Sequence, residues 1–101
     1  MVLTTIPNKE AGEKIARNLI EKRLAACVTI SPPSHSLYWW QGKIEEEEEH
    51  VLLIKTKKEL FSKLERKILE LHPYEVPEII AIPLIKGYIK YLDWIDKETG
   101  I

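Results

Sequence analysis

The first third of the chain alternates between short apolar runs and one amphipathic segment. Residues 2–6 are apolar and β-branched and are followed by a proline, a pattern that predicts a strand. Asn8 is a favourable N-cap, and the apolar positions of residues 11–19 recur at helical spacing, which predicts a helix that ends near Arg23. Residues 25–30 form a compact apolar run too short for a helix, so we expect a buried strand there.

The middle of the chain predicts a long hairpin with an acidic return strand. Residues 31–34 carry two adjacent prolines, which indicate a bend or a bulged edge because proline cannot join a central ladder. Residues 36–40 resume as an aromatic strand, and residues 41–43 are typical of a tight turn. The return strand passes through five consecutive glutamates, residues 45–49, before it becomes apolar at residues 51–54. Since like charges on one strand repel, we expect this acidic part to be exposed, to project from the body and to meet basic neighbours, another subunit included.

The last part of the chain predicts two helices on either side of a strand. Thr56 and Glu59 have the spacing of a capping box, and residues 60–71 then show the clearest 3.6-residue apolar stripe. The proline after His72 ends this helix. Residues 78–85 are apolar and β-branched, which predicts a strand that its internal proline makes an edge or a bulge. A final helix is expected to place three apolar residues on one face, namely Ile89, Leu92 and Ile95.

The order of these elements predicts the fold class. The order β-α-β-β-α-β-α indicates a single α+β domain over residues 1–101, in which a ferredoxin-like βαββαβ unit is followed by an extra C-terminal helix. Two helices on one face leave the other face of the sheet uncovered, although its strands are apolar. A closed homo-oligomer would cover it, and the adjacent Trp39 and Trp40 are typical of an interface core.

Composition and charge narrow the function classes. The formal charge of −1, with basic and acidic residues interleaved, gives no footprint for nucleic acid or an anionic membrane. No run reaches the roughly 18 apolar residues of a membrane helix. The single Cys27 excludes an intrachain disulfide and favours a reducing, cytoplasmic compartment. Few amide side chains among many charges favour a heat-adapted source.

Five segments together resemble the CutA family of divalent-cation-tolerance proteins. They are residues 21–28 (EKRLAACV), 38–44 (YWWQGKI), 53–56 (LIKT), 71–79 (LHPYEVPEI) and 91–94 (YLDW). The resemblance implies a ferredoxin-like protomer in a tight homotrimer with sheets packed around the three-fold axis, an architecture similar to that of the PII signalling proteins. It also implies a cytoplasmic location, an association with tolerance of copper and other divalent metals, and no established enzymatic activity or organic cofactor.

Two residues are the candidate metal ligands. Cys27 is either a small buried core residue or a soft copper ligand. His72 either caps the last carbonyl groups of its helix and interacts with the helix dipole, or acts as a metal ligand or a residue that lines a cleft. Two such ligands are an incomplete site, because zinc and cupric sites take three or four. The glutamates of residues 45–49 are either a solvated strand or a loose set of oxygen ligands for divalent cations.

A second group of residues is predicted to line a cleft. Tyr74 and Glu75 lie in a proline-bounded loop that suits a preformed site. Lys55, at the end of an apolar strand, is either a surface lysine or an anion-holding group that faces this loop. The leading hypothesis is a copper-binding or other divalent-metal-binding homotrimer that takes part in the response to metal. The alternative is a PII-like trimer that binds a small anion or a protein partner between subunits. An enzyme with Cys27 and His72 as nucleophile and base is the least supported of the three.

Overall fold

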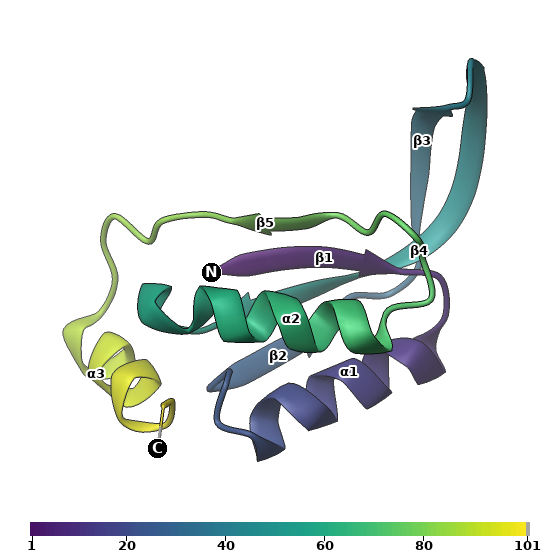
Figure 1. The fold of residues 1–101 in the computed structure, drawn as a ribbon. Coiled ribbons are helices and arrows are strands. Elements are labelled where there is room, and N and C mark those ends of the chain that lie inside the picture. The colour runs from purple at the N-terminus through teal and green to yellow at the C-terminus, as the bar shows by residue number, and fades with distance from the viewer. Residues whose placement is uncertain (101) are drawn as a thin grey trace.

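A computed structural model describes residues 1–100 and shows a five-stranded antiparallel sheet with helices on one face (Figure 1). The sheet order is β2-β4-β1-β5, and β3 pairs with the outer part of β4. This is the predicted ferredoxin-like α+β arrangement with a C-terminal helix; Ile101, the last residue of the predicted domain, lies outside the described residues. The elements are β1 (Val2–Ile6), α1 (Lys9–Glu21), β2 (Cys27–Ile30), β3 (Ser34–Trp40), β4 (Lys43–Lys55), a 3-10 turn (Lys58–Leu60), α2 (Phe61–Leu71), β5 (Ile79–Ala81) and α3 (Ile89–Lys97).

The start of α1 follows the local sequence signals. The Oδ1 atom of Asn8 accepts a hydrogen bond of 2.8 Å from the backbone N–H of Ala11, which confirms the predicted N-cap. The helix closes with Arg23 in the left-handed region at φ 59°, and the backbone N–H of Leu24 bonds to the carbonyl of Leu19 at 2.9 Å.

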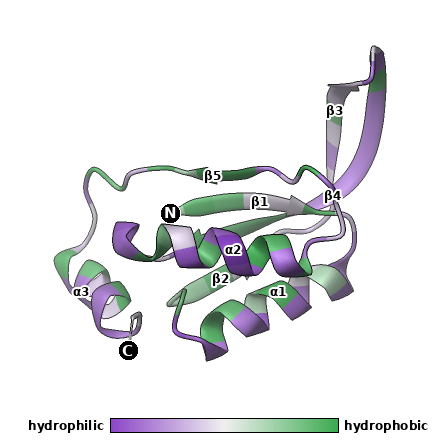
Figure 2. Ribbon diagram, viewed as in Figure 1, coloured by the Kyte–Doolittle hydropathy of each residue, from purple (hydrophilic) through white to green (hydrophobic). Residues whose placement is uncertain are grey.

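The predicted hairpin projects from the sheet as an arm, formed by β3 and the outer half of β4 (Figure 1). Its pairing runs from Ser34 opposite Glu49 to Trp40 opposite Lys43. Gln41 and Gly42 close it with φ angles of 50° and 79°, the two positive values that a type I′ turn requires. Figure 2 shows β4 changing from hydrophilic in the arm to hydrophobic in the sheet.

The core lies between the sheet and the two helices. In β1 every second residue is buried, and these residues pack against fully buried apolar side chains of α1 and α2. The opposite face of the sheet carries a row of cross-strand partners from β5 to β2: Ile80, Leu3, Leu53 and Thr29. No helix of the described chain covers this row, which we call the open face; Ile80 is 46% exposed there.

Two predicted details are wrong. The hydroxyl of Thr56 donates to the carbonyl of Leu24 at 2.6 Å, so it does not cap a helix, and α2 begins only after the 3-10 turn. The last strand is limited to Ile79–Ala81, because Pro83 has no N–H to continue the ladder. The predicted final helix is present as α3, in which Ile95 is buried and Ile89 is 64% exposed.

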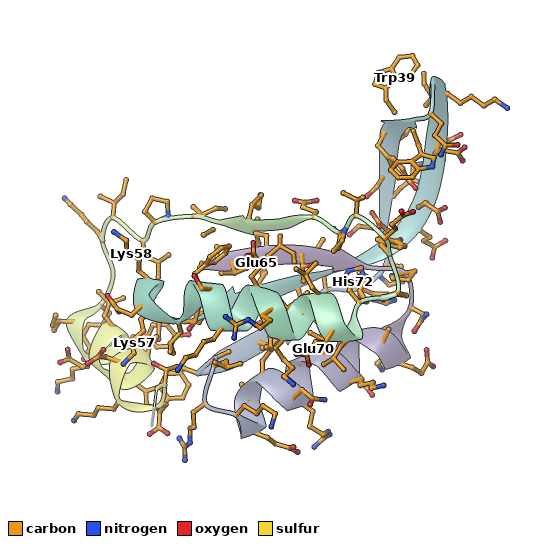
Figure 3. All side chains as sticks on the ribbon, in the orientation of Figure 1. Trp39, Lys57, Lys58, Glu65, Glu70 and His72 are labelled. Atoms are coloured by element: carbon orange, nitrogen blue, oxygen red, sulfur yellow. The ribbon has the colours of Figure 1, made fainter. Side chains whose placement is uncertain are left out.

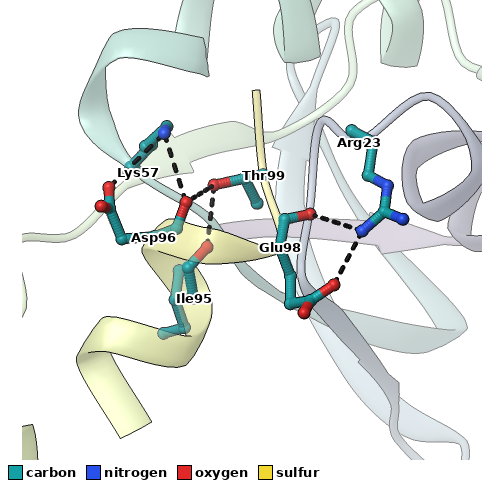
Figure 4. Close-up of polar contacts among 6 residues, drawn as sticks. All are labelled: Arg23, Lys57, Ile95, Asp96, Glu98 and Thr99. Carbon is teal, nitrogen blue, oxygen red and sulfur yellow. Dashed lines mark hydrogen bonds and ion pairs between the residues drawn. The ribbon is translucent and has the colours of Figure 1, made fainter. Parts of the chain in front are cut away.

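Polar contacts at the C-terminal end of α3 (Figure 4) hold this helix near the end of α1 and the start of α2, where Figure 1 shows it. The guanidinium of Arg23 donates to Glu98 at 2.7 Å, and the ammonium of Lys57 lies 3.4 Å from Asp96. The buried hydroxyl of Thr99 donates to the carbonyl of Ile95 at 2.8 Å. The helix is therefore not a cover for the open face.

Thr4 gives a stability prediction. Its side chain is fully buried in β1, and its hydroxyl oxygen has no hydrogen-bond partner among the described residues. Valine has nearly the same shape and no polar atom, so Thr4→Val is expected to stabilise the fold by about 1 kcal/mol. Denaturant unfolding at fixed protein concentration measures this change. Thr29→Val is the contrasting control, because the Thr29 hydroxyl already accepts a hydrogen bond from Lys55 and its loss is not expected to stabilise the fold; equal stabilisation by both would contradict the explanation.

Candidate functional site

A cavity of about 670 Å³ lies where the arm leaves the sheet, and we call it the acidic cavity. Along β4 alternate residues share a face, so Glu45, Glu47 and Glu49 all point to the same side of the arm as the open face. The loop after α2 forms the other wall. The lining comprises five carboxylates, three aromatic rings and four other residues: Glu45, Glu47, Glu49, Glu75, Glu78, Tyr38, Trp40, Tyr74, Thr5, Ser36, Leu37 and Val76.

Glu49 is the buried member of this set. It is 5% exposed, and its carboxylate accepts a hydrogen bond of 2.8 Å from the hydroxyl of Tyr74. Burial, and then the hydrogen bond to Glu49, raise the pKa of Tyr74 well above its usual value. The phenol therefore stays a neutral donor, and it ties the loop to the base of the arm.

His72 holds the same loop from the other side. The backbone N–H of Tyr74 donates to Nδ1 at 3.0 Å, so Nε2 carries the proton and donates to the carbonyl of Thr5 at 2.7 Å. Burial lowers the pKa of His72, although the bond to Thr5 and the charge of Glu49 act against it. Both ring nitrogens are occupied within the chain. Figure 3 shows His72 at the C-terminal end of α2, near the base of the arm.

The field in the acidic cavity is strongly negative. Of the described residues, those that line the cavity include five carboxylates and no lysine, arginine or histidine. Burial, and then the charges of Glu47, Glu45 and Glu49, raise the pKa of Tyr38 on the facing strand. Carboxylates next to aromatic faces attract cations, both metal ions and organic ammonium groups. An anion at this place would be repelled.

Lys55 and Cys27 form a separate cluster on β4 and β2. They are paired in register; the Lys55 ammonium lies 4.0 Å from Sγ of Cys27 and donates to the hydroxyl of Thr29 at 2.7 Å. The sequence shows no basic neighbour of Cys27, and the strand pairing supplies one. Within one chain Lys55 therefore does not face the loop of Tyr74 and Glu75, which was one of its two predicted readings.

The structure does not bring Cys27 and His72 together within one chain. Cys27 pairs with Lys55, whereas Thr5, the partner of His72, pairs with Val51. Four residues of β4 separate the two positions, about 13 Å along the strand. Among residues 1–100 no three His, Cys, Asp or Glu side chains gather in a group that could hold a metal ion. One chain alone therefore lacks a metal site of this kind.

The other predicted site residues have clear places. Tyr74 and Glu75 line the acidic cavity together, while Trp39 lies at the tip of the arm with 72% of its surface exposed (Figure 3). Trp40 points to the opposite side and lines the cavity. Sequence reasoning missed the grouping of Glu45, Glu47 and Glu49 with the loop; their spacing of two residues was the available signal.

These features define a ferredoxin-like α+β protein with a projecting acidic arm and an uncovered apolar sheet face. A family model described as CutA1 divalent ion tolerance protein matches residues 1–98. The chain belongs to this family.

Relatives and solved structures agree with this assignment. The divalent-cation tolerance protein CutA of Thermus thermophilus is 48% identical over 100 residues, covering 99% of this chain and 97% of the relative. Its structure aligns with a TM-score of 0.96 over 98% of this chain and 96% of that one. A structure described as the periplasmic divalent cation tolerance protein CutA from Archaeoglobus fulgidus is 42% identical, with a TM-score of 0.93 over 96% and 94% of the two chains.

A plant relative is longer. The chloroplastic protein CutA 1 of Oryza sativa is 44% identical over 99 residues, which cover 98% of this chain. The chain spans 56% of that relative's length.

Proposed function

We propose that this protein assembles as a homotrimer that binds divalent metal ions, copper among them, and takes part in the response to metal. The observation that carries the proposal is the acidic cavity beside the open face. Its carboxylates are the hard oxygen ligands that divalent cations prefer, and Cys27 on the same face is a soft ligand suited to copper. Membership of a divalent ion tolerance family supports the same reading.

Assembly supplies what one chain lacks. Among residues 1–100 no three His, Cys, Asp or Glu side chains gather closely enough to hold an ion, and two carboxylates alone leave most of the coordination sphere of a divalent cation unfilled. The apolar open face and the exposed Trp39 are suited to contact with other copies. Three copies packed through these faces would place donors of neighbouring chains near one another. The metal ion would then be bound cargo, with a ligand set drawn from more than one chain.

The test compares two faces of the same strand. Copper, zinc and magnesium ions are titrated by calorimetry into wild type, into Glu45→Gln/Glu47→Gln and into Glu46→Gln/Glu48→Gln. The first pair lines the acidic cavity and the second points away from it, although both variants lose the same charge. We expect the first variant to bind at least about tenfold more weakly, with the second near wild type.

Equal losses in both variants would contradict a site in the cavity. Cys27→Ala is expected to weaken copper binding while leaving magnesium binding unchanged, because thiolate selects soft metals. If Cys27→Ala binds both copper and magnesium as tightly as wild type, Cys27 is not part of the site.

The alternative, a PII-like trimer that binds a small anion, would need a binding site other than the acidic cavity. An anion would meet five carboxylates in the acidic cavity, and Lys55 lies away from it. Within one chain the cavity therefore favours cations.

We further infer that the protein is cytoplasmic and is not an enzyme. We expect its partners to be its own copies, with no organic cofactor and no nucleic-acid or membrane partner. Within residues 1–100, no helix is long and apolar enough to cross a membrane. A heat-adapted source stays a prediction from composition.

A further inference from the structure

A second hollow, of opposite charge, lies on the helical side of the molecule. It measures about 430 Å³ and is formed where α1 ends and along α2. We call it the basic hollow. Five cationic side chains and one carboxylate line it, above a floor of two leucines and beside a glycine: Lys22, Arg23, Lys63, Arg66, Lys67, Glu70, Leu24, Leu60 and Gly100.

Most of this positive charge has no counter-ion among residues 1–100. Arg23 is paired with Glu98, and Lys67 with Glu70 at 2.9 Å. Lys22, Lys63 and Arg66 form no ion pair and no side-chain hydrogen bond with any of residues 1–100. Like charges this close repel, so an anion that bridges them would be held by several contacts at once.

The pKa of Glu70 is affected by the positive charges that line the hollow. The hydrogen bond and charge of Lys67, and then the charges of Arg66 and Lys22, lower the pKa of the Glu70 carboxyl. Lys22 belongs to the end of α1, so the charges of both helices act at one place. Figure 3 shows Glu70 on α2, on the side where α1 lies.

The shape and position of the hollow suit a small ligand. Its volume lies within the range of roughly 300–1,000 Å³ found for small-molecule sites. Leu24 and Leu60 are only 9% exposed and give it an apolar floor, against which the carbon part of a ligand can pack. The hollow is on the helix layer, so assembly through the open face would leave it accessible.

We infer that the basic hollow binds phosphate groups, with Lys22, Lys63 and Arg66 as the principal contacts. Arginine and lysine are the side chains that recognise phosphate, the first by its planar fork and the second as a point charge. The phosphate belongs either to a soluble organic phosphate or to a lipid headgroup. This inference is independent of metal binding at the acidic cavity.

The experiment titrates adenosine triphosphate and inorganic tripolyphosphate, each without metal, into the assembled protein by calorimetry. Vesicles of phosphatidylcholine, with and without phosphatidic acid, form the lipid arm, measured by co-sedimentation. The test variant is Lys63→Ala/Arg66→Ala. The control is Lys14→Ala/Arg17→Ala, which removes the same charge from exposed positions of α1 outside the hollow.

We expect wild type and control to bind at least one phosphate probe with similar affinity, and the test variant to bind about tenfold more weakly or not at all. Binding should also weaken as salt is raised from about 50 to about 300 mM, because the contacts are ionic. Saturable binding of free phosphates identifies a soluble ligand, and binding only to vesicles with phosphatidic acid identifies a headgroup. Equal loss in both variants, or no binding of any probe at millimolar concentration, would overturn the inference. Thermal unfolding of each variant checks that the fold is intact.

Discussion

Replacing Leu53 by glutamate is expected to convert the proposed trimer into monomers of 11.8 kDa. Leu53 lies in the middle of the open face, between Leu3 on β1 and Thr29 on β2. If other copies cover this face, each protomer would have to bury a carboxylate without a partner. That desolvation costs roughly several kcal/mol per charge, enough to dissociate an assembly held by apolar contact. Sedimentation equilibrium at micromolar concentration measures the mass directly.

The matched control is Leu69→Glu. Leu69 is 52% exposed on α2, on the other layer of the molecule, so the same substitution there should leave the mass of the proposed trimer unchanged. A Leu53→Glu protein that keeps the wild-type mass would show that the open face is not the assembly surface. A wild-type protein that sediments as a monomer would contradict the trimer itself.

Replacing His72 by leucine is expected to destabilise the protein by about 2–4 kcal/mol. His72 is 8% exposed, and its ring satisfies two backbone groups, the carbonyl of Thr5 and the N–H of Tyr74. Leucine fills a similar space but leaves both groups without a partner. His35→Leu, in the arm, is the control: the ring of His35 is exposed and pairs with Glu46, so its loss should cost less than about 1 kcal/mol.

The same histidine predicts a pH dependence with a definite sign. Because burial lowers the pKa of His72 in the folded state, protonation favours the unfolded state. Its stabilising contribution is complete above the unfolded pKa of about 6.5 and is lost as the pH falls toward the folded value. The free energy of unfolding should therefore decrease below about pH 6.5 by up to about 1.4 kcal/mol per pH unit.

Chemical unfolding at about pH 7.5, 6.5 and 5.5, on either side of the ordinary histidine pKa and at one protein concentration, measures this slope. His72→Leu should lack most of it and His35→Leu should keep it. The nearby groups are Tyr74, whose raised pKa keeps it neutral throughout, and Glu49, whose charge reduces the effect. An unchanged slope in His72→Leu would assign the dependence to other groups.

Much of the fold was predictable from local patterns. The Asn8 cap, the turn at Gln41 and Gly42, and the break in the strand before the arm depend on residues close in sequence, so propensity and spacing indicate them. The capping box at Thr56 failed because its hydroxyl bonds to Leu24, 32 residues away. Such a partner is invisible to a local rule.

The candidate site was predictable only in part. Tyr74 and Glu75 were expected in a preformed loop, and they do line the acidic cavity. One of the two readings of Lys55 had it face that loop, but antiparallel pairing places it beside Cys27 within the chain. A shift of a few residues in register would have changed this neighbour, and no feature of either strand taken alone specifies the register.

The sequence by itself determined the alternation of helices and strands, the acidic arm and the apolar strands that leave one sheet face uncovered. These properties follow from the period of hydrophobic residues and from single caps and turns, which act over a few residues. The tertiary structure decided which side chains meet. It separated Cys27 from His72, buried His72 between Thr5 and Tyr74, and gathered charges of opposite sign into two separate cavities. The physical reason is that these neighbours come from pairing and packing between segments far apart in the chain, and the energy of those contacts exists only once the segments have assembled.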